Sequence, residues 1–286
     1  MNRILVTGGS GQLGQCFQNL TSNRPEWIFF FPSKEEVNIC EIGMVEFYVQ
    51  KHQINTIINT AAYTQVDQAE KEKPQAYAVN KQAIENLLFV AKKNKMKILF
   101  FSTDYVFSQQ KKGFNNESDT ILPKGIYAQS KAAGESQIQQ SDFPTVLIRT
   151  SWLFSPYGKN FVKTILRLAQ SNQPLKVVND QWGSPTFGPD LAAISLELLV
   201  NYPAQNEIFH FSNQGVTNWS DFAKETLKQA KINKQVVPIS SEKHQTLAPR
   251  PKRSVLGTSK IQSYLGISPR PWQEALGDCL EQLIDG

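Results

Sequence analysis

The sequence is poor in the residues that form disulfides and metal sites. Its 286 residues include only three cysteines and three histidines. Cys16, Cys40 and Cys279 are far apart and odd in number, which excludes a disulfide framework and predicts a reducing compartment. The histidines do not stand at the spacings of a metal-binding motif. We therefore expect no zinc site.

Long apolar runs and strong charge are also missing. No apolar stretch is long enough to cross a bilayer, and the N-terminus leads directly into a predicted strand rather than a signal peptide. The formal net charge is +5, with no long basic block outside residues 243–253, whereas nucleic-acid binding usually requires a concentrated basic face. We expect a cytoplasmic protein that binds neither membranes nor nucleic acid.

What the sequence does contain is an alternation of short apolar runs and helical stretches. Strands are expected at residues 3–7, 27–31, 56–62, 97–103 and 145–151. Helices are expected at residues 12–21, 45–52 and 74–95, and from residue 127 onward. Such alternation predicts an α/β protein with a doubly wound parallel sheet, the Rossmann fold.

The alternation weakens beyond residue 155. Helices at 160–170 and 190–201 are separated there by loops that contain proline and glycine. We expect an NAD(P)-binding Rossmann domain at residues 1–154 and a smaller, mostly helical substrate-binding lobe at residues 155–286. The boundary is soft, because the apolar segments VLIRTSW and EIFHFSN could return to the sheet.

A glycine-rich turn connects the first strand to the first helix. In VTGGSGQLG the glycines Gly8, Gly11 and Gly14 let a backbone approach phosphates, and the helix dipole favours their negative charge. A tight turn is the alternative, but the motif opens a complete βαβ unit, which favours dinucleotide binding. The cofactor residues expected from this turn are Gly8, Ser10, Gly11, Gln12, Leu13 and Gly14.

The second strand predicts which dinucleotide is bound. It ends in FFFPSKEE, without an acidic residue placed to hold a ribose 2′-hydroxyl. Ser33 and Lys34 could instead contact a 2′-phosphate, although Lys34 could also be a solvated loop charge. NADPH is therefore the expected cofactor, with NADH as a possible second one.

Two tyrosine–lysine pairs have the same spacing, Tyr77 with Lys81 and Tyr127 with Lys131. Residues four apart share a helix face, where a lysine can lower the pKa of a tyrosine that donates a proton to a reduced ketone. Thr103 ends a predicted strand, where ligands bind in open α/β sheets, and its hydroxyl could hold the ketone oxygen. Thr103, Tyr127 and Lys131 are therefore the expected catalytic residues, with Ser102 as the rival of Thr103.

Several segments together resemble the extended short-chain dehydrogenase/reductase family and, within it, the dTDP-4-dehydrorhamnose reductases. These segments are GGSGQLG, NTAAYTQVDQAE, STDYVF, YAQSKAAGE, RTSWLF, NFVKTILRLA, NDQWGSPT and RPKRSVL. They extend from the first residue to beyond Leu256. The resemblance implies NADPH-dependent reduction of the C4 ketone of dTDP-4-dehydro-β-L-rhamnose to dTDP-L-rhamnose, a precursor of surface polysaccharides such as lipopolysaccharide O-antigen.

The resemblance also implies further site residues. Those expected beside the cofactor are Asn38, Ile39, Ala61, Ala62 and Tyr63, with Asn38 standing where the family usually has an aspartate. Those expected at the dTDP-sugar are Thr64, Val66, Thr103, Asp104, Tyr105, Trp152 and Arg250. Trp152 could instead be a core aromatic residue, and Arg250 a surface charge.

Two departures from the family concern its magnesium-linked dimer. Cys16 and Pro189 stand where some members have acidic residues. We therefore expect no structural magnesium, and the chain could be a monomer or a homodimer.

Two other functions remain open. The first is another nucleotide-sugar epimerase or dehydratase, although a dehydratase would typically have glutamate where Tyr105 stands. The second is a non-catalytic, NADP-binding regulatory subunit, against which the intact Thr103, Tyr127 and Lys131 count.

Overall fold

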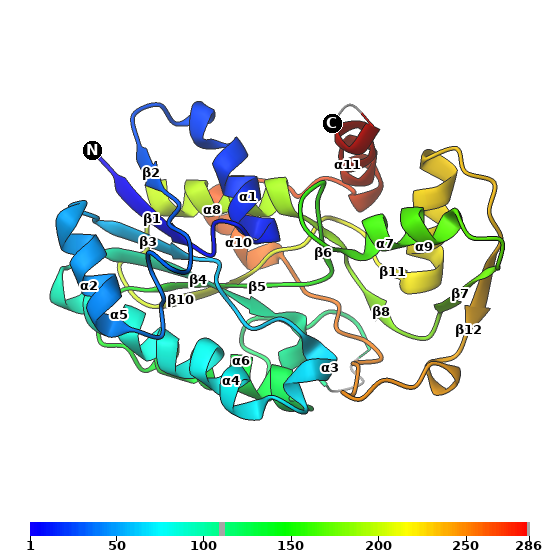
Figure 1. Ribbon diagram of the computed structural model, residues 1–286, viewed down its shortest axis with the longest axis horizontal. Helices are drawn as coiled ribbons and strands as arrows, with labels where there is room; N and C mark the ends of the chain where they lie inside the picture. Colours follow the sequence, from blue (N-terminus) through cyan, green and yellow to red (C-terminus); the bar gives the residue numbers. More distant parts are fainter. Residues whose placement is uncertain (109–111, 285–286) are drawn as a thin grey trace.

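The computed structural model describes residues 1–108 and 112–284, which form a larger lobe around one sheet and a smaller lobe beside it (Figure 1). Within these residues the main sheet has six strands, all parallel, in the order β10-β5-β4-β3-β1-β2. Their bounds are β1 (Arg3–Thr7), β2 (Ile28–Phe30), β3 (Thr56–Asn59), β4 (Lys97–Thr103), β5 (Val146–Thr150) and β10 (Glu207–His210). The order reverses between β1 and β3, the kind of position where doubly wound sheets bind ligands.

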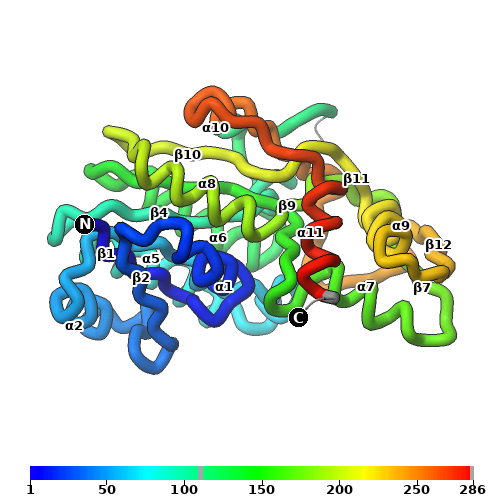
Figure 2. Tube along the Cα trace, turned by 90° about the horizontal axis from the view of Figure 1, so that it is seen from above, coloured from blue at the N-terminus to red at the C-terminus, as the bar shows by residue number. Residues whose placement is uncertain are grey.

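Helices cover both faces of this sheet, as Figures 1 and 2 show. One face packs against α1 (Gln12–Asn19), α8 (Gly188–Val200) and α10 (Ser259–Leu265). The other packs against α2 (Ile42–Lys51), α5 (Ala83–Lys93) and α6 (Ile126–Gln139). Ile4, Leu5 and Val6 of β1 are fully buried, because successive strand residues point to opposite, equally covered faces. The predicted doubly wound parallel sheet is confirmed.

The helix expected at residues 74–95 is divided by a π-helical turn. It consists of α4 (Lys73–Tyr77), the turn η2 (Ala78–Gln82) and α5. Gly134 of α6 packs against this turn so closely that an added Cβ would lie 2.2 Å from the Asn80 carbonyl oxygen. The extra residue of the turn leaves no trace in the apolar pattern, so the sequence predicted an unbroken helix.

The smaller lobe surrounds a separate core that contains Phe154, Phe187, Phe222 and Trp272. Its helices are α7 (Phe161–Ala169), α9 (Trp219–Gln229) and α11 (Trp272–Ile284). Its paired strands are β7 (Leu175–Val178) with β12 (Val236–Ile239) and β8 (Trp182–Gly183) with β11 (Thr217–Asn218), while β6 (Leu153–Phe154) pairs with β9 (Thr186–Phe187) at the junction. The remaining short helices of the whole described chain are α3 (Val66–Ala69), η1 (Thr21–Asn23), η3 (Asp104–Val106) and η4 (Ser241–Lys243).

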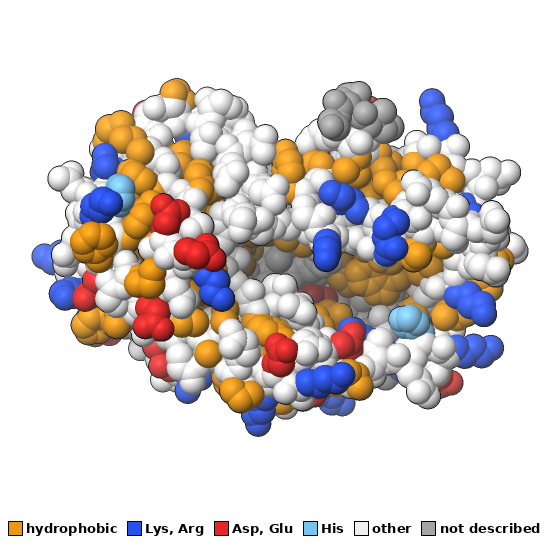
Figure 3. Space-filling model, in the orientation of Figure 1, with side chains coloured by type: hydrophobic (Ala, Val, Ile, Leu, Met, Phe, Trp, Pro, Cys, Tyr) orange, Lys and Arg blue, Asp and Glu red, His pale blue; other side chains and the backbone are white. Residues whose placement is uncertain are grey.

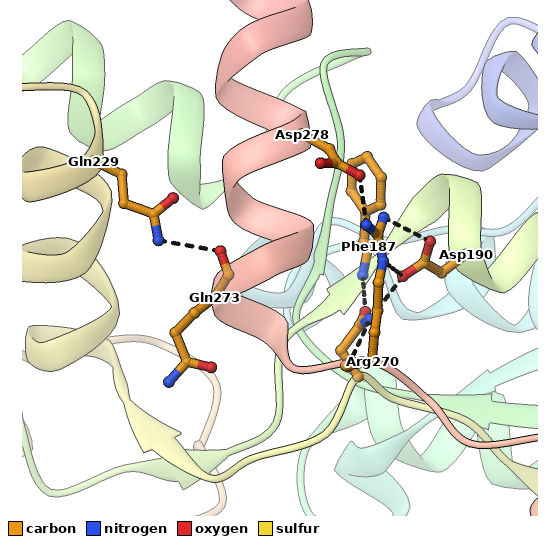
Figure 4. Close-up of polar contacts among 7 residues, drawn as sticks. Phe187, Asp190, Gln229, Arg270, Gln273 and Asp278 are labelled. Carbon is orange, nitrogen blue, oxygen red and sulfur yellow. Dashed lines mark hydrogen bonds and ion pairs between the residues drawn. The ribbon is translucent and has the colours of Figure 1, made fainter.

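An arginine joins the two lobes on the side of α8 and α11 (Figure 4). The Arg270 guanidinium binds the Asp190 carboxylate of α8 through Nε at 2.8 Å and Nη2 at 2.9 Å, and it also pairs with Asp278 of α11. Its Cζ lies 5.5 Å from the centre of the Phe187 ring.

No helix in the described part of the chain is long and apolar enough to span a bilayer.

Candidate active site

A cavity of about 1660 Å³ lies between the lobes, visible as the hollow in Figure 3. It is lined by the segments that follow β1, β3 and β4 and, from the other side, by Trp152, Lys159 and Trp219. Ligand sites usually occupy roughly 300–1,000 Å³. This cavity is large enough for a dinucleotide together with a second ligand.

The three glycines of the first turn have three different environments. Gly8 has φ 70°, and an added Cβ would lie 2.7 Å from the Ala61 amide nitrogen, so the turn requires glycine here. Gly14 faces away from the cavity, and its Cβ would lie 2.4 Å from the Gly8 carbonyl oxygen. A Cβ on Gly11 would meet only that oxygen, at 3.1 Å. Gly8 and Gly11 line the cavity, whereas Gly14 packs α1 against the turn.

The start of α1 fits a diphosphate. No side chain caps its first turn, so its backbone N–H groups are available to an anion. The Nε2 atom of Gln12 is buried without a hydrogen-bond partner among the described residues. Ser10, Gln12 and Leu13 line the cavity as expected.

The segment after β2 contributes fewer contacts than expected. Lys34, Asn38 and Ile39 line the cavity, but Ser33 does not. The Ser33 hydroxyl accepts a hydrogen bond from the Glu36 amide at 3.3 Å, and the Glu36 carboxylate accepts one from the Ser33 amide at 2.8 Å. Ser33 therefore stabilises its own loop.

The segment after β3 is held by a residue that the sequence analysis missed. Ala61, Ala62, Tyr63, Thr64 and Val66 all line the cavity as expected. Asn80 accepts a hydrogen bond from the Tyr63 amide at 2.9 Å and donates to the Tyr63 carbonyl at 3.1 Å and to the Ser130 hydroxyl at 3.0 Å. The π-helical turn thereby connects this segment to α6.

Thr103, Tyr127 and Lys131 meet at the floor of the cavity. Thr103 ends β4, while Tyr127 and Lys131 lie one turn apart on α6. Thr103 and Tyr127 line the same cavity, and the Thr103 hydroxyl accepts a hydrogen bond from the Tyr105 amide at 3.2 Å. The Lys131 ammonium donates to the Phe101 carbonyl at 2.7 Å. The rival of Thr103, Ser102, also lines the cavity, and its hydroxyl is buried without a described partner.

The expectation of a lowered tyrosine pKa is wrong for this structure. Burial raises the pKa of Tyr127 to about 12, although the neighbouring Thr103 side chain acts in the opposite direction. Burial lowers the pKa of Lys131 to about 8, against the nearby Glu135 carboxylate. The Lys131 ammonium is hydrogen-bonded to the Phe101 carbonyl, and burial outweighs any lowering of the tyrosine pKa. Tyr127 is consequently a neutral phenol at pH 7, which can donate a proton.

Asp104 follows Thr103 and is 2% exposed. Its carboxylate accepts hydrogen bonds from the Thr103 hydroxyl at 3.2 Å and from the Ser254 hydroxyl. Burial nevertheless raises the pKa of Asp104 to about 7. Sequence analysis did not identify Ser254, which reaches this site from 150 residues along the chain.

The aromatic wall of the cavity is strained. Trp152 has φ 48°, which is uncommon for a residue other than glycine. Its ring stacks on Trp219 with centroids 3.5 Å apart and an interplanar angle of 8°. Gly183 lies beneath the indole, since an added Cβ would come within 2.6 Å of it. Tyr105 also lines the cavity and meets the Tyr127 ring edge to face at 5.7 Å.

Arg250, which was expected at the dTDP-sugar, and the alternative tyrosine–lysine pair both lie outside the cavity lining. Arg250 does not line the cavity, and its guanidinium pairs with the Asp67 carboxylate of α3 at 2.7 Å. In the other tyrosine–lysine pair, Lys81 lies 3.7 Å from the Glu85 carboxylate, and neither Tyr77 nor Lys81 lines the cavity. Within residues 1–108 and 112–284, no three His, Cys, Asp or Glu side chains are grouped to hold a metal ion.

Comparisons with known proteins agree with this geometry. The model of the RmlD substrate binding domain family matches residues 1–284. A dTDP-4-dehydrorhamnose reductase of Aggregatibacter actinomycetemcomitans is 38% identical, over 96% of this chain and 97% of the relative. The spore coat polysaccharide biosynthesis protein SpsK of Bacillus subtilis is 35% identical, over 99% of this chain and 98% of the relative.

Solved structures agree as well. The crystal structure of dTDP-4-dehydrorhamnose reductase from Bacillus anthracis in complex with NADP has a TM-score of 0.93 and 34% identity, and the match covers 99% of this chain and 100% of that one. A dTDP-glucose 4,6-dehydratase of Streptomyces venezuelae, at 17% identity and a TM-score of 0.83, shares the fold alone. The chain belongs to the RmlD substrate binding domain family, among the dTDP-4-dehydrorhamnose reductases.

Proposed function

We propose that this protein uses NADPH to reduce the C4 ketone of dTDP-4-dehydro-β-L-rhamnose, giving dTDP-L-rhamnose for surface polysaccharide. The observation that carries the proposal is the meeting of Thr103, Tyr127 and Lys131 at the floor of a cavity large enough for both ligands. The family assignment supports the substrate, since relatives of 38% and 32% identity are dTDP-4-dehydrorhamnose reductases.

The residues of the cavity floor have distinct roles in this proposal. Tyr127 donates the proton that the reduced ketone oxygen requires, and its raised pKa keeps that proton in place at neutral pH. The Thr103 hydroxyl, next to Tyr127, holds the ketone oxygen. NADPH supplies the hydride when bound. Lys131 fixes α6 against β4 through the Phe101 carbonyl and places a positive charge beneath the cavity floor.

The remaining cavity residues hold the two ligands. Ser10, Gly11, Gln12 and Leu13 would hold the cofactor diphosphate at the start of α1. Asp104, Tyr105 and Trp152 would contact the sugar, because they line the same cavity as the catalytic residues. All three lie within residues 1–154, and α8, β10 and α10 belong to the larger lobe, so a boundary at residue 154 does not separate the cofactor site from the substrate site.

The test is the reaction itself. Purified protein would receive dTDP-4-dehydrorhamnose, generated in situ with the 3,5-epimerase, and the loss of NADPH absorbance would be followed. Tyr127→Phe should lower kcat by about two to four orders of magnitude, the usual size of a general-acid contribution. Tyr77→Phe is the matched control and should leave turnover nearly unchanged. No turnover by the wild-type protein, or equal turnover by the two variants, would contradict the proposal.

A further inference from the structure

A loop of the smaller lobe reaches the start of α1. This 155–160 loop lies between β6 and α7. Its Gly158 has φ 62°, and a Cβ added there would lie 3.2 Å from the Gln12 Cβ and 3.4 Å from the Gln12 Cα. The backbone of the loop is therefore packed against the first residue of α1, on the side where the cofactor diphosphate is proposed to bind.

The loop is rigidly built. The Ser155 hydroxyl accepts a hydrogen bond from the Tyr157 amide at 3.1 Å. Asn160 donates to the Ser155 carbonyl at 2.7 Å and caps α7 by accepting from the Lys163 amide at 3.1 Å. The Lys163 ammonium donates to the Pro156 carbonyl at 2.9 Å. Lys159 thus projects from a fixed backbone, which reduces the entropy lost when its side chain binds a ligand.

Lys159 is, within the described chain, an unpaired cation of the cavity wall. Within residues 1–108 and 112–284, the lysines that line the cavity are Lys34, Lys131 and Lys159. Lys131 is engaged by the Phe101 carbonyl, and Lys34 belongs to the segment after β2. Lys159 is exposed, and among the residues that the structure describes no carboxylate pairs with its ammonium. It follows Gly158, whose backbone packs against Gln12 at the start of α1.

We propose that Lys159 binds the diphosphate of the dinucleotide from the smaller lobe, opposite the N-terminus of α1. The ammonium adds a charge-assisted hydrogen bond to the backbone N–H groups of the helix. Because both NADPH and NADH carry this diphosphate, Lys159 contributes equally to the two cofactors. It thereby couples cofactor binding to the position of the smaller lobe, whose Trp219 also lines the cavity. The inference rests on the proposed function for its choice of ligand.

The test measures dissociation constants by fluorescence titration, without any sugar nucleotide. Lys159→Ala should raise the dissociation constants of NADPH and NADH by the same factor. We expect about tenfold, the size of one partly exposed charged contact. The affinity for ADP-ribose should fall to a similar degree. The affinity for adenosine 2′,5′-bisphosphate, which has no diphosphate, should change little. Lys159→Arg should retain most of the affinity. Lys228→Ala, on an exposed lysine of α9 in the same lobe, should change neither constant.

Three results would overturn the inference. Unchanged affinity for both cofactors would make Lys159 a solvated charge. A loss of affinity for NADPH but not for NADH would assign Lys159 to the 2′-phosphate. Weaker dTDP binding with unchanged NADPH binding would assign it to the diphosphate of the sugar nucleotide. Since these titrations need no turnover, a failed reductase assay with intact Lys159-dependent NADPH binding would reject the substrate and leave the inference standing.

Discussion

Replacing Asp104 with asparagine should stabilise this protein at alkaline pH. The carboxyl group is buried at the cavity floor, where it receives hydrogen bonds from Thr103 and Ser254. These bonds do not offset the cost of desolvating its charge, because the pKa rises from 3.8 to about 7. Asparagine has the same shape and no charge, and the Ser254 hydroxyl can rotate to accept from its amide.

The sign and size of the effect follow from proton linkage. Between pH 3.8 and about 7 the folded protein holds a proton on Asp104 that the unfolded chain has lost. This group's contribution to stability is fully present below pH 3.8 and is lost as the pH rises through about 7. A shift of about three units at 1.36 kcal/mol each gives an upper limit of roughly 4 kcal/mol. Relaxation around the ionised group reduces this, so we expect Asp104→Asn to gain about 1–3 kcal/mol at pH 8.

Urea unfolding followed by tryptophan fluorescence would measure this gain at pH 8 and at pH 4, where it should nearly vanish. The control is Asp142→Asn, on an exposed carboxylate whose pKa is lowered by its hydrogen bond to Lys92, so no gain is expected. The reasoning would be refuted if Asp104→Asn destabilised the protein equally at both pH values. A gain in stability with a loss of turnover would show that the site trades stability for function.

Three further predictions test the cofactor turn and the core. Gly11→Val should nearly abolish dinucleotide binding without unfolding the protein. Gly14→Ala should instead lower the melting temperature, because its Cβ would lie 2.4 Å from a carbonyl oxygen. The opposite pattern would reject a diphosphate site at the glycine-rich turn. Lys34→Ala should raise the KM for NADPH by about five- to thirtyfold and leave the KM for NADH unchanged. An equal rise in KM for both cofactors would assign Lys34 to the fold or the adenine pocket. Arg149→Met should cost about 3–5 kcal/mol in urea unfolding because it leaves the buried Glu135 carboxylate unpaired, and a cost below 1 kcal/mol would contradict this.

The strands and the cofactor turn were predictable from the sequence for a physical reason. Strands buried on both faces are continuous apolar runs, so the predictions at residues 3–7 and 97–103 match β1 and β4 in full. The glycine spacing marks the turn because Gly8 has a backbone conformation that other residues rarely adopt. The clustering of Thr103 with Tyr127 follows from their places at the end of a strand and the start of the next helix.

Other parts of the site depend on contacts that no local pattern records. Asn80 acts through a π-helical turn, whose extra residue does not change the apolar periodicity. Ser254 reaches Asp104, and Trp219 reaches the cavity, from distant parts of the chain. The predicted direction of the Tyr127 pKa shift was wrong because the spacing does not reveal how deeply the phenol is buried, nor that the Lys131 ammonium binds the Phe101 carbonyl.

The return of β10 to the main sheet has a consequence for biosynthesis. β10 pairs with β5, and α8 and α10 cover the face of the sheet that contains Ile4, Val6 and Leu99. A nascent chain that has emerged only as far as residue 154 therefore has an open sheet edge at β5 and an apolar face that α1 covers only in part. The larger lobe cannot be completed until α10 has left the ribosome. A fragment cut at residue 154 should aggregate. Most of the smaller lobe is inserted into the Rossmann fold, and α11 is appended after it.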